Sequence, residues 1–211
     1  MIVPYTNLYD EVLPDVPGVT PAVALNAIRN ACIEFCSRSN IWVVDHDPIA
    51  SIADESVYQF EPPNGAVVSS VVVARFSGFE LDPATQGELS EEYGDWQSKS
   101  GTPEYFIQEN SEELILCPKP IAAVADALKM KVSLKPSRKS TGIEGWIVES
   151  YQEELAHGAK AKLFAMNKKP WSSAELAGFH LSAFETAIAA AKMAAAKSLG
   201  RGKLRTKPQF F

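Results

Sequence analysis

The spacing of hydrophobic positions changes twice along the chain. An amphipathic helix opens at Thr20-Pro21, where apolar residues recur every three or four positions. Residues 45–135 instead contain short alternating or continuous apolar runs separated by turn-forming residues, a pattern typical of short β-strands. Helical spacing returns near Ile147 and continues, with one interruption, to about Leu199. The order is therefore helix, β-rich insertion, helix, helix.

The borders of these elements carry their own signals. Residues 1–19 are punctuated by proline and glycine, which predicts an extended arm or loop. Thr141 with Glu144, and Ser172 with Glu175, have the spacing of capping boxes, so we expect them to begin the second and third helices.

The fold class predicted from this pattern is α+β. The first helix needs a partner for its apolar stripe, so we expect residues 1–44 and 136–199 to form one antiparallel helical bundle, with one N-terminal and two C-terminal helices. About five short strands in residues 45–135 suggest a small inserted β-sandwich or β-barrel domain. Residues 200–211 follow a Gly-Arg-Gly stop as an extended C-terminal tail.

The last helix has an unusually small-residue face. Its second half is mostly alanine, which favours helix formation but buries little area per residue. Such a narrow face suits close approach by another helix, from this chain or from a neighbouring copy. The candidate subunit-packing residues are Phe179, Ala183, Ala187, Ala190 and Ala194.

The charge of the chain is unevenly distributed. Residues 192–211 contain six of the 20 basic residues and none of the 26 acidic ones, so the body is strongly acidic and its C-terminal end basic. The tail could contact nucleic-acid phosphates, or it could be a peptide arm that becomes ordered on a protein partner. Two terminal phenylalanines favour a protein partner, because aromatic residues gain most when buried at interfaces. The candidate docking residues are Arg201, Lys203, Leu204, Arg205, Lys207, Phe210 and Phe211.

No pattern points to catalysis, to a cofactor or to a metal site. His46 lies between two aspartates and is expected in a solvated loop, while His157 is expected to pair with Glu153 one turn earlier on a helix surface. His180 is expected to be packed or at an interface. Cys32 and Cys36 fall on the apolar face of the first helix, where a buried thiol is usually inert. No glycine-rich phosphate loop is present.

Cysteine usage and the terminal sequence predict where the protein is made. Three cysteines form no disulfide framework, residues 1–14 have no features of a signal peptide, and no run is long enough to span a bilayer. We therefore expect a soluble protein synthesised in a host cytoplasm, with no membrane partner.

Four stretches carry a family resemblance. Residues Leu13–Trp42, Gly101–Phe106, Leu114–Pro120 and Tyr151–Phe184 resemble, in the same order, parts of the head-to-tail adaptor proteins of tailed bacteriophages. The resemblance covers most of the chain, and its motifs are structural rather than catalytic.

This resemblance implies a non-enzymatic component of the virion neck. Such adaptors form a ring, usually twelve-fold, that binds the portal protein after DNA packaging, extends the DNA channel and attaches the tail or nozzle proteins. The implied partners are the portal, tail proteins, neighbouring copies of the chain, and genomic DNA passing without sequence-specific binding. A tail-completion or tail-terminator protein, and a DNA-binding packaging factor that uses the basic tail, are the alternatives.

Overall fold

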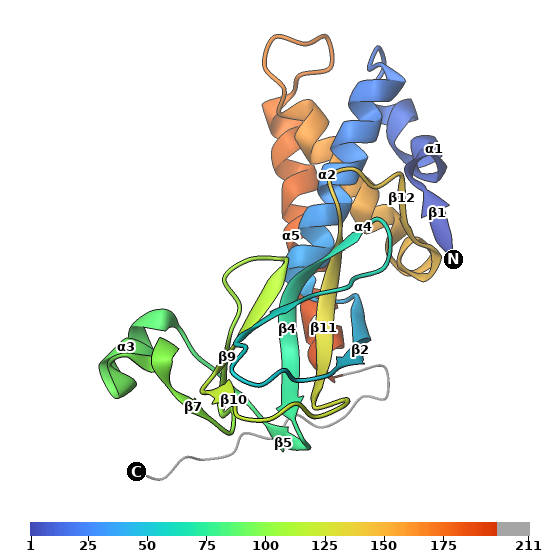
Figure 1. The fold of residues 1–211 in the computed structure, drawn as a ribbon. Helices are drawn as coiled ribbons and strands as arrows, with labels where there is room; N and C mark the ends of the chain where they lie inside the picture. The colour runs from blue at the N-terminus through green and yellow to red at the C-terminus, as the bar shows by residue number, and fades with distance from the viewer. Residues whose placement is uncertain (198–211) are drawn as a thin grey trace. The chain divides into compact units, whose positions relative to one another are not determined.

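The computed structural model describes residues 1–197, and the chain divides into two compact units (Figure 1). One unit combines residues 1–42 with the chain from Lys135 onward, and the other is Val43–Leu134. The first is mainly helical and the second mainly β-structure, so the fold is mixed α and β as predicted.

The N-terminal segment is more structured than predicted. It forms strand β1 (Ile2–Pro4), the short helices η1 (Tyr5–Leu8) and α1 (Tyr9–Val12), and a further turn, η2 (Leu13–Asp15). Its apolar side chains are buried at a spacing of three or four residues; they are Tyr5, Leu8, Val12 and Val16. The prediction of an extended arm was therefore wrong. Pro4 is the N-cap of η1 and Pro14 lies in the first turn of η2, so these prolines begin short helices and do not keep the segment extended.

Three long helices dominate the first unit. They are α2 (Pro21–Ser39), α4 (Gly145–Phe164) and α5 (Ala174–Lys197), and each contacts the other two. Phe35 of α2 lies at their meeting point, with its ring centroid 5.0 Å from Tyr151 of α4 and 6.1 Å from Phe184 of α5. Burial of such aromatic rings stabilises the packing of all three helices.

Neither predicted capping box forms. The N-cap of α4 is Glu144, which makes no side-chain cap hydrogen bond, because residues Gly142–Glu144 form strand β12 and pair with β1. At α5 the capping hydroxyl belongs to Ser173, whose Oγ accepts from the Leu176 amide at 3.3 Å. The Ser172 hydroxyl instead bonds within the preceding loop, to Met166 and Lys169.

Two four-stranded sheets organise the second unit. The first has the order β2-β11-β4-β5, and the second β3-β9-β8-β6. The strands of the first are β2 (Val43–Ile49), β11 (Leu128–Pro136), β4 (Ala66–Phe76) and β5 (Phe79–Glu80). Those of the second are β3 (Val57–Gln59), β9 (Glu113–Cys117), β8 (Tyr105–Ile107) and β6 (Asp82–Pro83). The described strands outnumber the five that were predicted, because several are only two or three residues long.

Smaller elements complete this unit. A parallel pair joins β7 (Ser100–Gly101) to β10 (Lys119–Pro120), and helix α3 (Gln86–Tyr93) precedes the turn η3 (Trp96–Ser98). Helix α3 begins at a capping box between Thr85 and Glu88. A local core of Leu89, Trp96, Ile107 and Cys117 holds α3 against the second sheet.

Candidate assembly surfaces

Helix α5 has a buried face and an exposed face, and they differ in composition. The buried side chains recur every three or four residues; they are His180, Phe184, Ile188 and Ala191. The exposed face carries large hydrophobic side chains, namely Leu176, Phe179, Leu181 and Met193. Phe179, which is 63% exposed, is therefore available to contact another protein.

A glycine permits the close packing of α4 and α5. A Cβ atom added at Gly158 of α4 would lie 2.6 Å from the ring of Phe184. The two helices can approach this closely only because position 158 has no side chain. Phe184 of α5 is thus used within the chain, whereas Ala183, Ala187 and Ala190 lie away from the buried face.

The predicted packing residues line a groove between α4 and α5. Phe179, Ala183, Ala187 and Ala190 belong to its wall; Ala194 lies one turn further along the helix. The remaining lining residues are polar or acidic; they are Glu153, Glu154, His157, Ser182 and Thr186. The sequence located the α5 wall by its spacing, but it could not show that the wall from α4 would be acidic.

Two histidines join the helices at this groove. Nδ1 of His157 lies 2.7 Å from Nδ1 of His180, so one ring donates and the other accepts. His180 is buried and stacks on Phe164 with an interplanar angle of 9°. Burial lowers the pKa of His180, and the nearby charges of His157 and Lys160 lower it further, while Asp15 acts in the opposite direction. The expected pairing of His157 with Glu153 was wrong, and the expectation of a packed His180 is confirmed.

An ion-pair network connects α2 to α4 and to α5. Glu34 of α2 accepts from Arg38, one turn away, and from Lys162 of α4, while Arg38 also pairs with Glu185 of α5. Partial burial raises the pKa of Glu34, but the hydrogen bonds from Lys162 and Arg38 outweigh this effect and hold the pKa below its usual value. The pair between Arg38 and Glu185 lies where α5 meets α2, and the pair between Lys162 and Glu34 lies where α4 meets α2.

The side chains considered as candidates for catalysis or metal binding make structural contacts instead. His46 lies in β2 and is largely buried, with Nδ1 2.7 Å from the Asp47 carbonyl oxygen and Nε2 accepting from the Glu61 amide at 3.0 Å. The expected solvated loop was therefore wrong. Both ring nitrogens form hydrogen bonds with nearby backbone groups, so His46 has a structural role.

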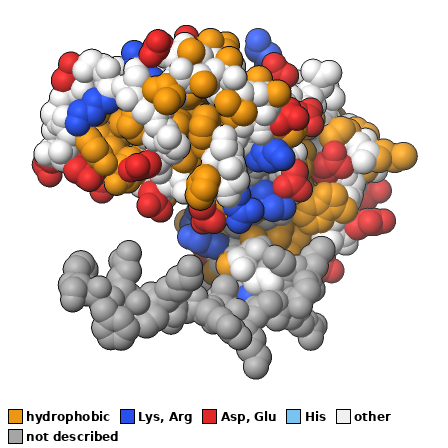
Figure 2. Space-filling view, turned by 60° about the horizontal axis from the view of Figure 1, so that its bottom comes forward, with side chains coloured by type: hydrophobic (Ala, Val, Ile, Leu, Met, Phe, Trp, Pro, Cys, Tyr) orange, Lys and Arg blue, Asp and Glu red, His pale blue; other side chains and the backbone are white. Residues whose placement is uncertain are grey.

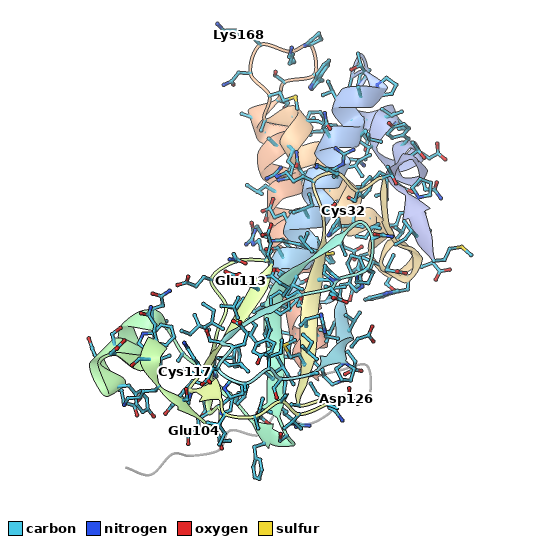
Figure 3. All side chains as sticks on the ribbon, viewed as in Figure 1. Cys32, Glu104, Glu113, Cys117, Asp126 and Lys168 are labelled. Atoms are coloured by element: carbon cyan, nitrogen blue, oxygen red, sulfur yellow. The ribbon has the colours of Figure 1, made fainter. Side chains whose placement is uncertain are left out.

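The thiols are buried as predicted. Cys32 lies on α2 and Cys117 on β9, as labelled in Figure 3. Burial raises the pKa of Cys36 to about 12 and that of Cys32 well above its usual value. Within residues 1–197 no three His, Cys, Asp or Glu side chains lie close enough together to hold a metal ion.

The candidate docking tail lies outside the described residues. This applies to Arg201, Lys203, Leu204, Arg205, Lys207, Phe210 and Phe211. Among residues 1–197, no helix combines the length and the apolar character required to cross a bilayer.

Comparison with known families now defines the class of protein. The chain combines a three-helix assembly, whose α5 carries an alanine-lined groove, with a β-rich unit, and this has the character of a protein that contacts other proteins. Residues 4–206 match the model of the SU10 adaptor protein family. The chain therefore belongs to this family of phage head-to-tail adaptors. The comparison with curated proteins found no match.

Family membership has three direct consequences. The protein is a phage adaptor, which implies a place in the virion and contacts with portal and tail components. A structural family of this kind suggests a role other than catalysis.

Proposed function

We propose that this protein forms a ring, with twelve copies, that binds the portal after DNA packaging, extends the DNA channel and provides the attachment site for the tail. The observation that carries the proposal is the family match together with the open alanine stripe on α5. Each copy of a ring needs a surface for its neighbour, and the groove between α4 and α5 offers one.

In the proposed ring, neighbouring copies pack against the outer face of α5. Ala183, Ala187 and Ala190 leave room for a neighbouring backbone to come close, and Phe179 supplies a large apolar side chain at one end. Close contact between small residues gains packing energy without displacing bulky groups. Glu153 and Glu154 at the opposite wall favour a neighbour that brings basic or hydroxyl-bearing groups.

The portal step uses residues 200–211. Four basic residues combine there with Leu204, Phe210 and Phe211, so the segment has both charge for attraction and apolar side chains for anchoring. In this arrangement residues 200–211 bind the portal, and the acidic remainder of the chain lines the channel. A negatively charged wall prevents DNA from adhering during passage.

Truncation tests the portal step. A protein lacking Gly202–Phe211 should fold with an unchanged circular dichroism spectrum but should no longer bind DNA-filled heads that carry the portal. Replacement of Phe210 and Phe211 by serine keeps all four charges and should also abolish binding. Wild-type binding by the truncated protein would refute the role of the tail.

The basic tail also favours a second candidate, a DNA-binding packaging factor. Binding to phosphates releases counterions, so affinity for DNA would fall steeply with salt. A salt titration between 50 and 200 mM separates the two functions, since about four phosphate contacts would cost roughly two orders of magnitude in affinity. An aromatic-anchored arm on the portal should be much less sensitive. A tail-completion or tail-terminator role would instead be revealed by binding to isolated tails and not to portals.

A further inference from the structure

A loop in the β-rich unit exposes five consecutive apolar residues. Residues 121–125, between β10 and β11, are two aliphatic residues and three alanines, and all five are exposed. Ile121 is 67% exposed and Val124 42%. Runs of this kind are unfavourable in water unless another molecule covers them. Figure 2 shows hydrophobic side chains gathered among charged ones on the surface.

Hydrogen bonds from the buried Ser51 hold this loop from beneath. The Ser51 hydroxyl donates to the Ala122 carbonyl at 2.9 Å and accepts from the Val124 amide at 2.9 Å. The Ser51 amide donates to the Val124 carbonyl, also at 2.9 Å. Since Ser51 itself is 2% exposed, the exposed loop is fixed from beneath. A preformed surface loses little conformational entropy when it binds.

A second loop enlarges the apolar surface. Ile52 follows Ser51 directly and is 60% exposed, and the Asp54 amide donates to the Pro120 carbonyl next to Ile121. On the other side the Ser77 amide donates to the Ala127 carbonyl, which brings the turn of the β4–β5 hairpin beside the end of the loop. We call residues Ile52, Ala53 and 121–125 the loop patch.

Acidic residues follow each segment of the loop patch. Asp54 and Glu55 come after Ile52 and Ala53, and Asp126 comes after residue 125; all three are exposed. Asp126 is labelled in Figure 3 near the start of β11. A partner that covers the apolar centre should therefore carry Lys or Arg around its own apolar face.

We infer that the loop patch is the surface by which this protein holds the tail-side component of the virion, a protein that presents apolar side chains flanked by basic ones. The inference rests on the proposed function, which uses residues 200–211 for the portal and α5 for neighbouring copies but leaves tail attachment without a surface. The loop patch is a third candidate surface, and its apolar, hydrogen-bonded and acid-flanked character fits a stable protein contact.

The test replaces the centre of the loop patch. The double variant Ile121→Ser/Val124→Ser keeps the backbone bonds to Ser51 but removes the two large exposed side chains. The matched control is Val72→Ser, which removes a 46%-exposed valine from β4 in the same unit. Each protein is added to DNA-filled heads, and bound adaptor and attached tails are counted separately by electron microscopy and sedimentation.

The expected result is normal adaptor binding to heads with at least a tenfold loss of attached tails in the double variant, and normal attachment in the control. Normal tail attachment by the double variant would overturn the inference and leave the proposed function intact. Loss of head binding by the double variant would also overturn it, by assigning the loop patch to the portal or to a neighbouring copy. Failure of the wild-type protein to bind heads would instead contradict the proposed function.

A second experiment tests whether the partner surface is basic. Asp54→Lys/Asp126→Lys should reduce tail attachment at low salt, because like charges would then face each other. Attachment that is unchanged or improved would contradict a basic partner surface.

Discussion

At the scale of single residues, the pair His157 and His180 is the most unusual contact. In the neutral pair one Nδ1 donates and the other accepts, whereas protonation of the buried His180 ring places a positive charge beside Lys160. The pair therefore makes the joint between α4 and α5 sensitive to acid.

We expect the stability of the protein to fall as the pH drops below about 6.5. The pKa of His180 is lower in the folded protein than the usual histidine value of about 6.5. The unfolded chain consequently binds the proton more readily, so the contribution of neutral His180 is fully present above 6.5 and is lost as the pH falls through the folded pKa.

The measurement is the free energy of unfolding by urea at several values between pH 5 and 8. One titrating group contributes a slope of at most about 1.4 kcal/mol per pH unit. His180→Gln should be less stable than wild type at pH 8 but should have a flatter dependence between pH 5 and 7. Equal slopes in the two proteins would show that another group controls acid sensitivity.

At the scale of secondary-structure elements, the contact between α4 and α5 depends on one missing side chain. The Phe184 ring fills the space above Gly158. Three of its atoms would lie within 2.8 Å of a Cβ atom added at position 158. Packing at this distance cannot be relieved by a side-chain rotation alone, since Phe184 is itself fully buried.

Gly158→Ala should therefore destabilise the protein by about 1–3 kcal/mol, as overpacking does in closely packed cores. Gly178→Ala on α5 is the control, because nothing lies within 4 Å of its added Cβ. It should stabilise the protein by roughly 0.5–1 kcal/mol through better helix propensity. Both effects are read from urea unfolding curves, and a neutral Gly158→Ala would show that the helices can separate freely.

The observed helices and strands also show which parts of the fold the sequence patterns predicted correctly. Periodicity located the three long helices and the β-rich middle. It failed in residues 1–19, where Tyr5, Leu8, Val12 and Val16 have helical spacing that the prolines concealed. The capping boxes at Thr141 and Ser172 did not form. Glu144 of the first box belongs to strand β12, which pairs with β1, and the Ser172 hydroxyl bonds to Met166 in the preceding loop.

At the scale of the whole molecule, the acidic groove between α4 and α5 is the surface we assign to neighbouring copies. Its α5 wall was found from the spacing of alanines, whereas its α4 wall, with Glu153 and Glu154, required the two helices to be placed together. The tail residues Arg201–Phe211 remain a prediction from sequence.

Ala187→Glu should prevent ring assembly without unfolding the protein. The new carboxylate would stand in the groove beside two others and would block close approach. Ala189→Glu is the matched control, since Ala189 is exposed and does not line the groove.

Both variants should have melting temperatures close to wild type. Only Ala187→Glu should weaken self-association, by roughly tenfold or more, equivalent to about 1.4 kcal/mol. Sedimentation velocity in the presence of portal measures this. Equal assembly by the two variants would remove the groove from the subunit interface.

The sequence by itself determined the three long helices, the β-rich middle and the basic end of the chain, because spacing and composition are local properties. It also determined that Cys32 and Cys36 would be buried, since both lie on one helical stripe. Only the tertiary structure decided which face of α5 is covered, since that depends on the fit of Phe184 against Gly158 and on the contacts of α5 with α2, such as the ion pair between Arg38 and Glu185. It likewise decided that residues 121–125 stand exposed but fixed, because the serine that holds them is some seventy residues away in the chain.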